Sequence, residues 1–273
     1  MSKVILIARG MLRQEVRSVR VIMGYLLGLT LLAMGLNDFL GYIIQIKEPV
    51  NILEAFIVTA NQSMAGRFWV TGYLLVIADA PFVKANTCMI LYRSGRRVWN
   101  MGMVSYVLVQ AFLYTVSFAV LSVAVSIPYG FSGRIWSSPV YLLAANTSEA
   151  IAEKYHLYFE GMAMMRYMTV LQAFGITWLY MFCYLAFIGL LLYVCSFVPG
   201  GFWGLVAAAA VHLGGVFISL FAALPWCPVH YIDGAGSHWR YPCIFLALIL
   251  IMTTVSLSAI GNVDIPARTG GGV

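Results

Sequence analysis

Long apolar stretches alternate with short polar segments along most of the chain. A helix needs roughly 20 apolar residues to cross a bilayer, and six stretches approach that length. They comprise residues 21–44, 67–83, 101–127, 167–197, 202–224 and 241–260. The second is the shortest and contains Asp79, so its helix can also begin earlier, near Asn61. This pattern predicts an all-α integral membrane protein with six transmembrane helices.

The composition excludes a soluble globular protein. Of the 273 residues, 62% are hydrophobic and only 10% are charged, and a soluble core cannot enclose that much apolar surface. Because the six stretches use most of the residues, no separate soluble domain is expected. Residues 1–273 are therefore interpreted as one transmembrane domain.

The basic residues predict how the chain is oriented in the membrane. Placing the N-terminus, the segment 84–100, the turn 197–201 and the C-terminal tail on one side collects ten basic residues there, against six on the other side. The ten are Lys3, Arg9, Arg13, Arg17, Arg20, Lys84, Arg93, Arg96, Arg97 and Arg268. Cytoplasmic loops carry the excess of Lys and Arg, so both termini are expected in the cytoplasm. Orientation also explains the net charge of +6, and no nucleic-acid partner is needed.

Residues 1–20 predict an amphipathic helix on the membrane surface. Arg9, Arg13, Arg17 and Arg20 recur at steps of four, four and three, so they form one stripe on a helix, with apolar residues on the other side. Such a helix lies among the lipid headgroups and is attracted by anionic lipid. The alternative is a charged tail that only sets the topology.

Two segments on the outer side are expected to fold compactly. The loop 128–166 contains a predicted amphipathic helix over residues 146–158, and the segment between the fifth and sixth helices is rich in Pro, Gly and Trp, which favours an irregular cap. Cys227 and Cys243 flank that cap. They can form a disulfide in an oxidising compartment or remain separate thiols.

The sequence contains no motif for nucleotide binding, zinc proteolysis or nucleophilic hydrolysis. His230, Asp233 and His238 lie close together in the outer cap and suggest either a metal or acid–base cluster or an ordinary hydrogen-bonded loop. Ionisable residues within a membrane are functional candidates because burying them is costly. Asp79 and His212 are the two considered for a transport path, although His212 can equally be a neutral, hydrogen-bonded imidazole.

A polar elbow is predicted between the second and third helices. Asp79 precedes Pro81 by two residues, a pattern typical of a helix start. The new short helix should end at Ser94 and Gly95, where glycine supplies the backbone conformation of a helix end. Arg96 and Arg97 then begin the third transmembrane helix, and Trp99 is expected at the depth of the membrane interface.

These features, together with the runs "LLVIADAPF", "LYRSGRRVWNMG" and "LPW", resemble the permease subunits of ABC type-2 exporters, in the version common among Gram-positive bacteria. The resemblance implies a multi-pass protein of the bacterial cell membrane. It also implies that residues 81–97 form a coupling helix that docks on a separate ATPase subunit. The coupling residues carried over are Pro81, Lys84, Tyr92, Arg93, Arg96 and Arg97.

The resemblance further implies an assembly of two permeases, identical or related, with two ATP-binding-cassette ATPases. This chain would hold no cofactor and would not be an enzyme, since ATP and Mg would bind the partner ATPase. An amphipathic peptide, lipid or drug is the expected substrate. The alternatives are an ion- or proton-coupled secondary transporter that uses Asp79 and His212, and an outer-face membrane enzyme.

Overall fold

The computed structural model describes residues 3–80, 82, 87–147, 149–197, 202–217, 227–232 and 239–262. The described chain is mostly α-helical. Its helices are α1 (Lys3–Glu15), α2 (Val19–Ile46), α3 (Glu54–Ala60), α4 (Ser63–Ile77), α5 (Thr87–Ser94), α6 (Arg96–Ser126), α7 (Ser138–Ala144), α8 (Glu149–Lys154), α9 (Met162–Tyr167), α10 (Val170–Cys195), α11 (Phe202–Phe217) and α12 (Arg240–Asn262), with short 3-10 helices η1 (Ile127–Tyr129) and η2 (Pro228–Tyr231). Two short strands, β1 (Val50–Asn51) and β2 (Gly130–Phe131), pair in parallel.

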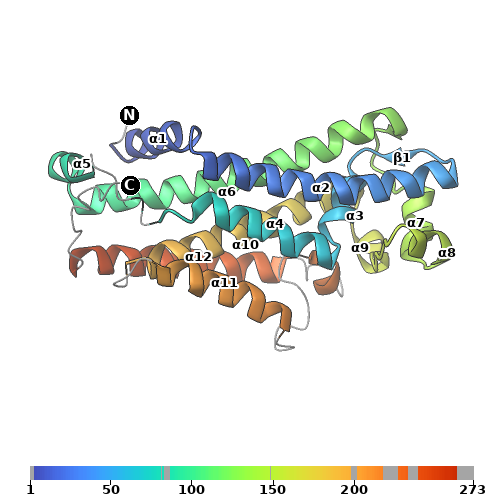
Figure 1. Cartoon of the computed structure of the whole chain (residues 1–273). Helices are drawn as coiled ribbons and strands as arrows, with labels where there is room; N and C mark the ends of the chain where they lie inside the picture. Colours follow the sequence, from blue (N-terminus) through green and yellow to red (C-terminus); the bar gives the residue numbers. More distant parts are fainter. Residues whose placement is uncertain are drawn as a thin grey trace.

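Four helical segments of the described chain are long and apolar enough to cross a membrane, namely Val19–Ile46, Arg96–Tyr129, Val170–Cys195 and Arg240–Ala259. They run along an elongated bundle (Figure 1). At one end lie α1, α5 and the start of α6, and at the other end lie β1, α7, α8 and α9 (Figure 1). These helices support the expected helical membrane protein and match four of the six predicted stretches.

The other two predicted stretches are shorter in the structure. α4 has 15 residues and ends at Ile77, well before residue 83. α11 has 16 residues, and residues 218–226 lie outside the described chain. Each described helix is shorter than the roughly 20 residues of a membrane crossing, so the described residues confirm four of the predicted spans and the other two stay predictions.

The second stretch is preceded by a break in the helix. α3 is entirely buried, and the chain turns at Asn61 before α4 begins. The Asn61 side chain donates to the Ile57 carbonyl at 2.8 Å and accepts from the Val229 backbone N–H at 3.1 Å. Cys227 also donates to the Ala60 carbonyl, at 3.7 Å from Sγ. The start of η2 is therefore anchored on the break between α3 and α4.

Glycines bring α2 and α4 into close contact. A Cβ at Gly24 would lie 2.7 Å from the Gly72 carbonyl oxygen, and one at Gly72 would lie 2.9 Å from the Gly24 carbonyl oxygen. Gly28 follows Gly24 by four residues and packs against the Tyr114 ring. Small residues at this spacing allow helices in membranes to approach closely.

This contact predicts a large difference between two glycines of the same helix. Gly24→Ala should lower the free energy of unfolding by about 1–3 kcal/mol, because its Cβ meets backbone that cannot move aside. Gly35→Ala is the matched control, since its Cβ would lie 3.7 Å from a Thr59 methyl group, an ordinary contact. Thermal unfolding in detergent measures both. Equal melting temperatures for the two variants would contradict the close contact.

Candidate functional site

A short helix follows α4 at the place where the sequence predicts an elbow. It is described from Thr87 to Ser94, whereas 81 and 83–86, with the predicted coupling residues Pro81 and Lys84, lie outside the described chain. The Gly95 N–H donates to the Leu91 carbonyl at 2.8 Å. Gly95 has a φ of 81°, which suits glycine. α6 begins directly afterwards, so the chain reverses within a few residues.

The elbow presents polar side chains to its surroundings. Tyr92 is 94% exposed, and Arg93, Arg96 and Arg97 are also exposed. Met89 adds an exposed apolar side chain, at 69%. α5 itself lies at the end of the bundle (Figure 1). The predicted coupling residues that are described thus form one accessible surface, which is called the elbow surface below.

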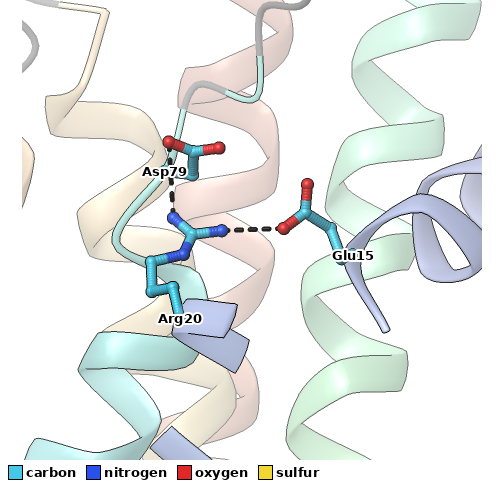
Figure 2. Close-up of polar contacts among 3 residues, drawn as sticks. All are labelled: Glu15, Arg20 and Asp79. Carbon is cyan, nitrogen blue, oxygen red and sulfur yellow. Dashed lines mark hydrogen bonds and ion pairs between the residues drawn. The ribbon is translucent and has the colours of Figure 1, made fainter. Parts of the chain in front are cut away.

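Arg20 connects the base of the elbow to the N-terminal helices (Figure 2). Its Nη2 donates to Glu15 Oε2 at 2.7 Å, and its Nη1 lies 3.4 Å from Asp79 Oδ1. Glu15 ends α1, Arg20 is in the first turn of α2, and Asp79 lies in the turn that follows α4. A single guanidinium therefore links three segments of the chain.

The two halves of this link differ in burial. The Glu15 side chain is 2% exposed, whereas the Asp79 side chain is 59% exposed. An exposed ion pair contributes only about 0–1 kcal/mol. A buried carboxylate needs its partner, because an unpaired charge inside a protein is costly. Arg20 thus stabilises the fold mainly by pairing with Glu15. The contact between Arg20 and Asp79 can form and break with little change in free energy.

These positions correct two predictions about the N-terminal segment. α1 ends at Glu15, and the chain turns before α2 starts at Val19, so residues 1–20 are not one helix. Arg20 belongs to α2 and to the ionic link, not to a membrane-surface stripe. Arg9, Arg13 and Arg17 remain exposed, as a surface role requires.

The apolar face of α1 packs in part on protein, while Ile5 and Leu6 remain exposed at 53% each. Ala8 and Met11 are buried, and Ile7 contacts Gly102 of α6, which runs beside α1. The amphipathic pattern therefore reflects core packing along α6. Trp99, expected at the membrane interface, is only 1% exposed and lies in the hydrophobic core. Its indole is enclosed by protein, and its depth in the membrane stays a prediction.

His212 lies in α11 and is buried against α10. Its Nδ1 is 3.0 Å from the hydroxyl oxygen of Tyr184, and the residue is 2% exposed. Asp79 lies instead at the base of the elbow, in contact with Arg20. The two residues considered for a transport path therefore lie in different surroundings, one buried between helices and one at the base of the elbow. The hydrogen bond of His212 agrees with the alternative that it is a hydrogen-bonded imidazole within the bundle.

A second polar cluster lies at the opposite end of the bundle and was not predicted. Glu54 is completely buried at the start of α3, outside the candidate spans. Its carboxylate accepts from the Ser137 N–H at 2.7 Å, the Ser137 hydroxyl at 2.5 Å and the Asn51 N–H at 3.0 Å. Burial raises the pKa of Glu54 to about 7, although the hydrogen bonds from Ser137 and Asn51 lower it in part. Asn51 and Glu54 have the spacing of a helix-capping box, which was the available signal in the sequence.

The same cluster fastens the long outer loop to α3. The Asn51 side chain donates to the carbonyls of Gly133 and Ile135, at 2.8 and 3.2 Å. β1 pairs with β2 beside these contacts, and Ser137 caps α7. Glu54, Asn51 and Ser137 are called the loop clamp below. The predicted helix over residues 146–158 is shorter in the structure, where α8 covers only Glu149–Lys154. The described part of the loop contains three short α-helices, α7, α8 and the start of α9.

The outer cap is only partly described. η2 is present, but Asp233 and His238 lie outside the described chain, as does the side chain of His230. Cys227 and Cys243 are both free thiols, so the disulfide alternative is not realised. Within the described residues, no group of three or more His, Cys, Asp or Glu side chains could hold a metal ion.

No protein-family model, no curated protein and no solved structure matches this chain. The elbow surface and the ionic link beneath it are therefore the features of the described chain that indicate a function.

Proposed function

We propose that this chain is the permease subunit of an ATP-driven ABC exporter. The observation that supports this proposal is the exposed elbow surface between α4 and α6. A helix of eight residues at the end of a membrane bundle, carrying an almost fully exposed tyrosine and three exposed arginines, is suited to bind another protein. Tyr and Arg are enriched among the residues that dominate binding at protein interfaces.

The expected partner is a pair of ATP-binding-cassette ATPases, which would hold ATP and Mg. A second permease, identical or related, would complete a path through the membrane. ATP-driven closure of the ATPases would press on the two elbows. Each elbow continues directly into α6 and adjoins α4, whose glycine contact with α2 transmits the displacement to a second long helix. The chain itself would bind no cofactor and catalyse no reaction.

Six membrane crossings, both termini in the cytoplasm and a bacterial cell membrane belong to the same proposal. α4 and α11 would supply the two additional crossings. An amphipathic cargo suits a path lined by apolar helices. The direction of transport, outward, follows from the resemblance to exporters.

Substitution of Tyr92 tests docking without changing the positive charge of the elbow, which is expected to orient the chain in the membrane. Tyr92→Ala should reduce recovery of an ATP-binding-cassette ATPase with the tagged chain about tenfold or more, because interface tyrosines often contribute 2 kcal/mol or more. Tyr158→Ala is the matched control, since Tyr158 is 70% exposed but lies in the loop at the other end of the bundle. Quantitative mass spectrometry of the purified complex measures the ratio.

The double variant Arg96→Glu with Arg97→Glu should weaken the same association, because it reverses the charge beside Tyr92. ATPase recovery equal to that of the wild type in both the Tyr92 and the arginine variants would rule out docking through the elbow. Transport by the reconstituted chain on an ion gradient, without any ATPase, would support instead a secondary transporter that uses Asp79 and His212.

A further inference from the structure

A groove of about 370 Å³ lies at the start of α10, at the end of the bundle away from the elbow. Its lining includes Tyr167, Met168, Gln172, Ile176, Leu179 and Trp239. Pockets for small molecules start at about 300 Å³, so the groove can accommodate one flexible chain. It is independent of the elbow surface and of the proposed transport function.

The groove combines an apolar wall with aromatic rings at its mouth. Ile176 and Leu179 extend it along α10, and the residues from Gln172 to Leu179 cover roughly 10 Å of helix. Tyr167 and Trp239 are 43% and 54% exposed. They flank the first turns of α10 and α12, which are both candidate membrane spans. Tyr and Trp are enriched where helices leave the hydrocarbon region, so the groove extends from the interface into one leaflet.

Gly175 leaves the wall of this groove bare. It is exposed, and a Cβ built on it would have no atom within 4 Å. In a membrane-spanning helix, a strip without side chains on the outer surface will be filled by lipid, because water is absent there. The open space at Gly175 thus lies on the same turn of α10 as Ile176 of the apolar wall.

Two arginines are sequence neighbours of the aromatic residues that line the groove. The Arg166 guanidinium lies 5.9 Å from the centre of the Tyr167 ring, and Arg240 directly follows Trp239. Both arginines are exposed, and neither forms an ion pair with another described residue. The N-terminal ends of two long helices also favour a negative group at this level.

From this juxtaposition we infer that the groove binds one anionic phospholipid. Its phosphate would lie between Arg166 and Arg240, and one acyl chain would follow Gly175, Ile176 and Leu179. A soluble phosphate would use only the arginines and leave the apolar wall uncovered. A zwitterionic lipid would use the wall but would gain less from the two cations.

Two variants separate the acyl-chain contact from the headgroup contact. Gly175→Leu fills the groove and should weaken binding of phosphatidylglycerol and of phosphatidylcholine by about tenfold, since displacing two methylenes from apolar contact costs roughly 0.8 kcal/mol each. Arg166→Gln with Arg240→Gln should remove the preference for phosphatidylglycerol and leave phosphatidylcholine binding unchanged. Gly10→Leu is the matched control, because Gly10 is also helical with no atom within 4 Å of its Cβ.

The full-length chain in detergent is titrated with each lipid and followed by native mass spectrometry, with melting temperatures confirming that each variant is folded. Wild type and Gly10→Leu should retain phosphatidylglycerol about fivefold more than phosphatidylcholine, an advantage of about 1 kcal/mol for one surface ion pair. Wild-type retention by both groove variants would overturn the inference. Displacement of the lipid by glycerol phosphate would also overturn it, because the site would then be one for a soluble anion.

Discussion

Replacing Arg20 with alanine should lower the free energy of unfolding by about 2–3 kcal/mol, because it removes a close cationic partner from the buried Glu15 carboxylate. Arg20 Nη2 and Glu15 Oε2 are 2.7 Å apart, and the Glu15 side chain is 2% exposed. Asp79→Asn should cost less than about 1 kcal/mol, because the Asp79 side chain is 59% exposed. Denaturation of the purified chain in detergent measures both effects.

The double variant Glu15→Gln with Arg20→Ala distinguishes the ion pair from packing. Neutralising the buried carboxylate should recover most of the stability lost in Arg20→Ala, because the remaining cost is that of the arginine side chain alone. Asp79→Asn serves as the control on the exposed side of the link. If Asp79→Asn destabilised the chain as much as Arg20→Ala does, the exposed pair and not the buried pair would hold the segments together.

The sequence predicted the four long helices well because their length alone identifies them. The stretch 21–44 became α2 (Val19–Ile46), and 241–260 became α12 (Arg240–Asn262). Hydropathy does not reveal a helix break, however, and a break at Asn61 separates α3 from the helix of the second stretch. That break is stabilised by a hydrogen bond from Val229, 168 residues away, and such a contact cannot be read from a local pattern.

The N-terminal helix shows a different limit. An amphipathic period identifies an apolar face but not the surface that covers it. Ala8 and Met11 are as suitable for lipid as for protein, and the structure places them against α6. Gly102, which receives Ile7, is the small residue that permits this packing. The exposed arginines of α1 were predicted correctly, whereas the partner of its apolar face was not.

The site predictions divide in the same way. The elbow was recognised because Ser94, Gly95 and the arginines are local signals, and the described part of the short helix ends where they predict. The loop clamp was missed because its partners, Glu54 and Ser137, are 83 residues apart. The capping-box spacing of Asn51 and Glu54 was a local signal for that helix start, but it does not reveal the distant partner Ser137.

The loop clamp should make stability depend on pH in a specific direction. Glu54 is buried without a cation, and burial raises its pKa from 4.5 to about 7 in the folded chain. The folded state therefore binds the proton more tightly than the unfolded state. The contribution of the protonated Glu54 side chain to stability is complete below about pH 4.5. It decreases as the pH rises towards 7 and stays low above that. A rise of this size corresponds to about 3 kcal/mol.

Glu54→Gln tests this dependence because glutamine resembles the protonated acid. The variant should lose the decrease between pH 5 and 8, and at pH 8 it should be more stable than the wild type, by up to about 3 kcal/mol. Glu48→Gln is the matched control, because Glu48 is exposed only six residues before Glu54 and is not one of the three residues of the loop clamp. It should retain the wild-type pH profile.

Thermal unfolding measured at several pH values decides between two descriptions of the clamp. If the carboxylate were ionised throughout and held by its three donors, Glu54→Gln would be less stable than the wild type at every pH. If the clamp holds a neutral acid near pH 6, the two curves should converge at low pH and separate as the pH rises. Because Ser137 donates through both its N–H and its hydroxyl, Ser137→Ala removes one donor and should lower the stability most above pH 7, where the charge on Glu54 needs that bond.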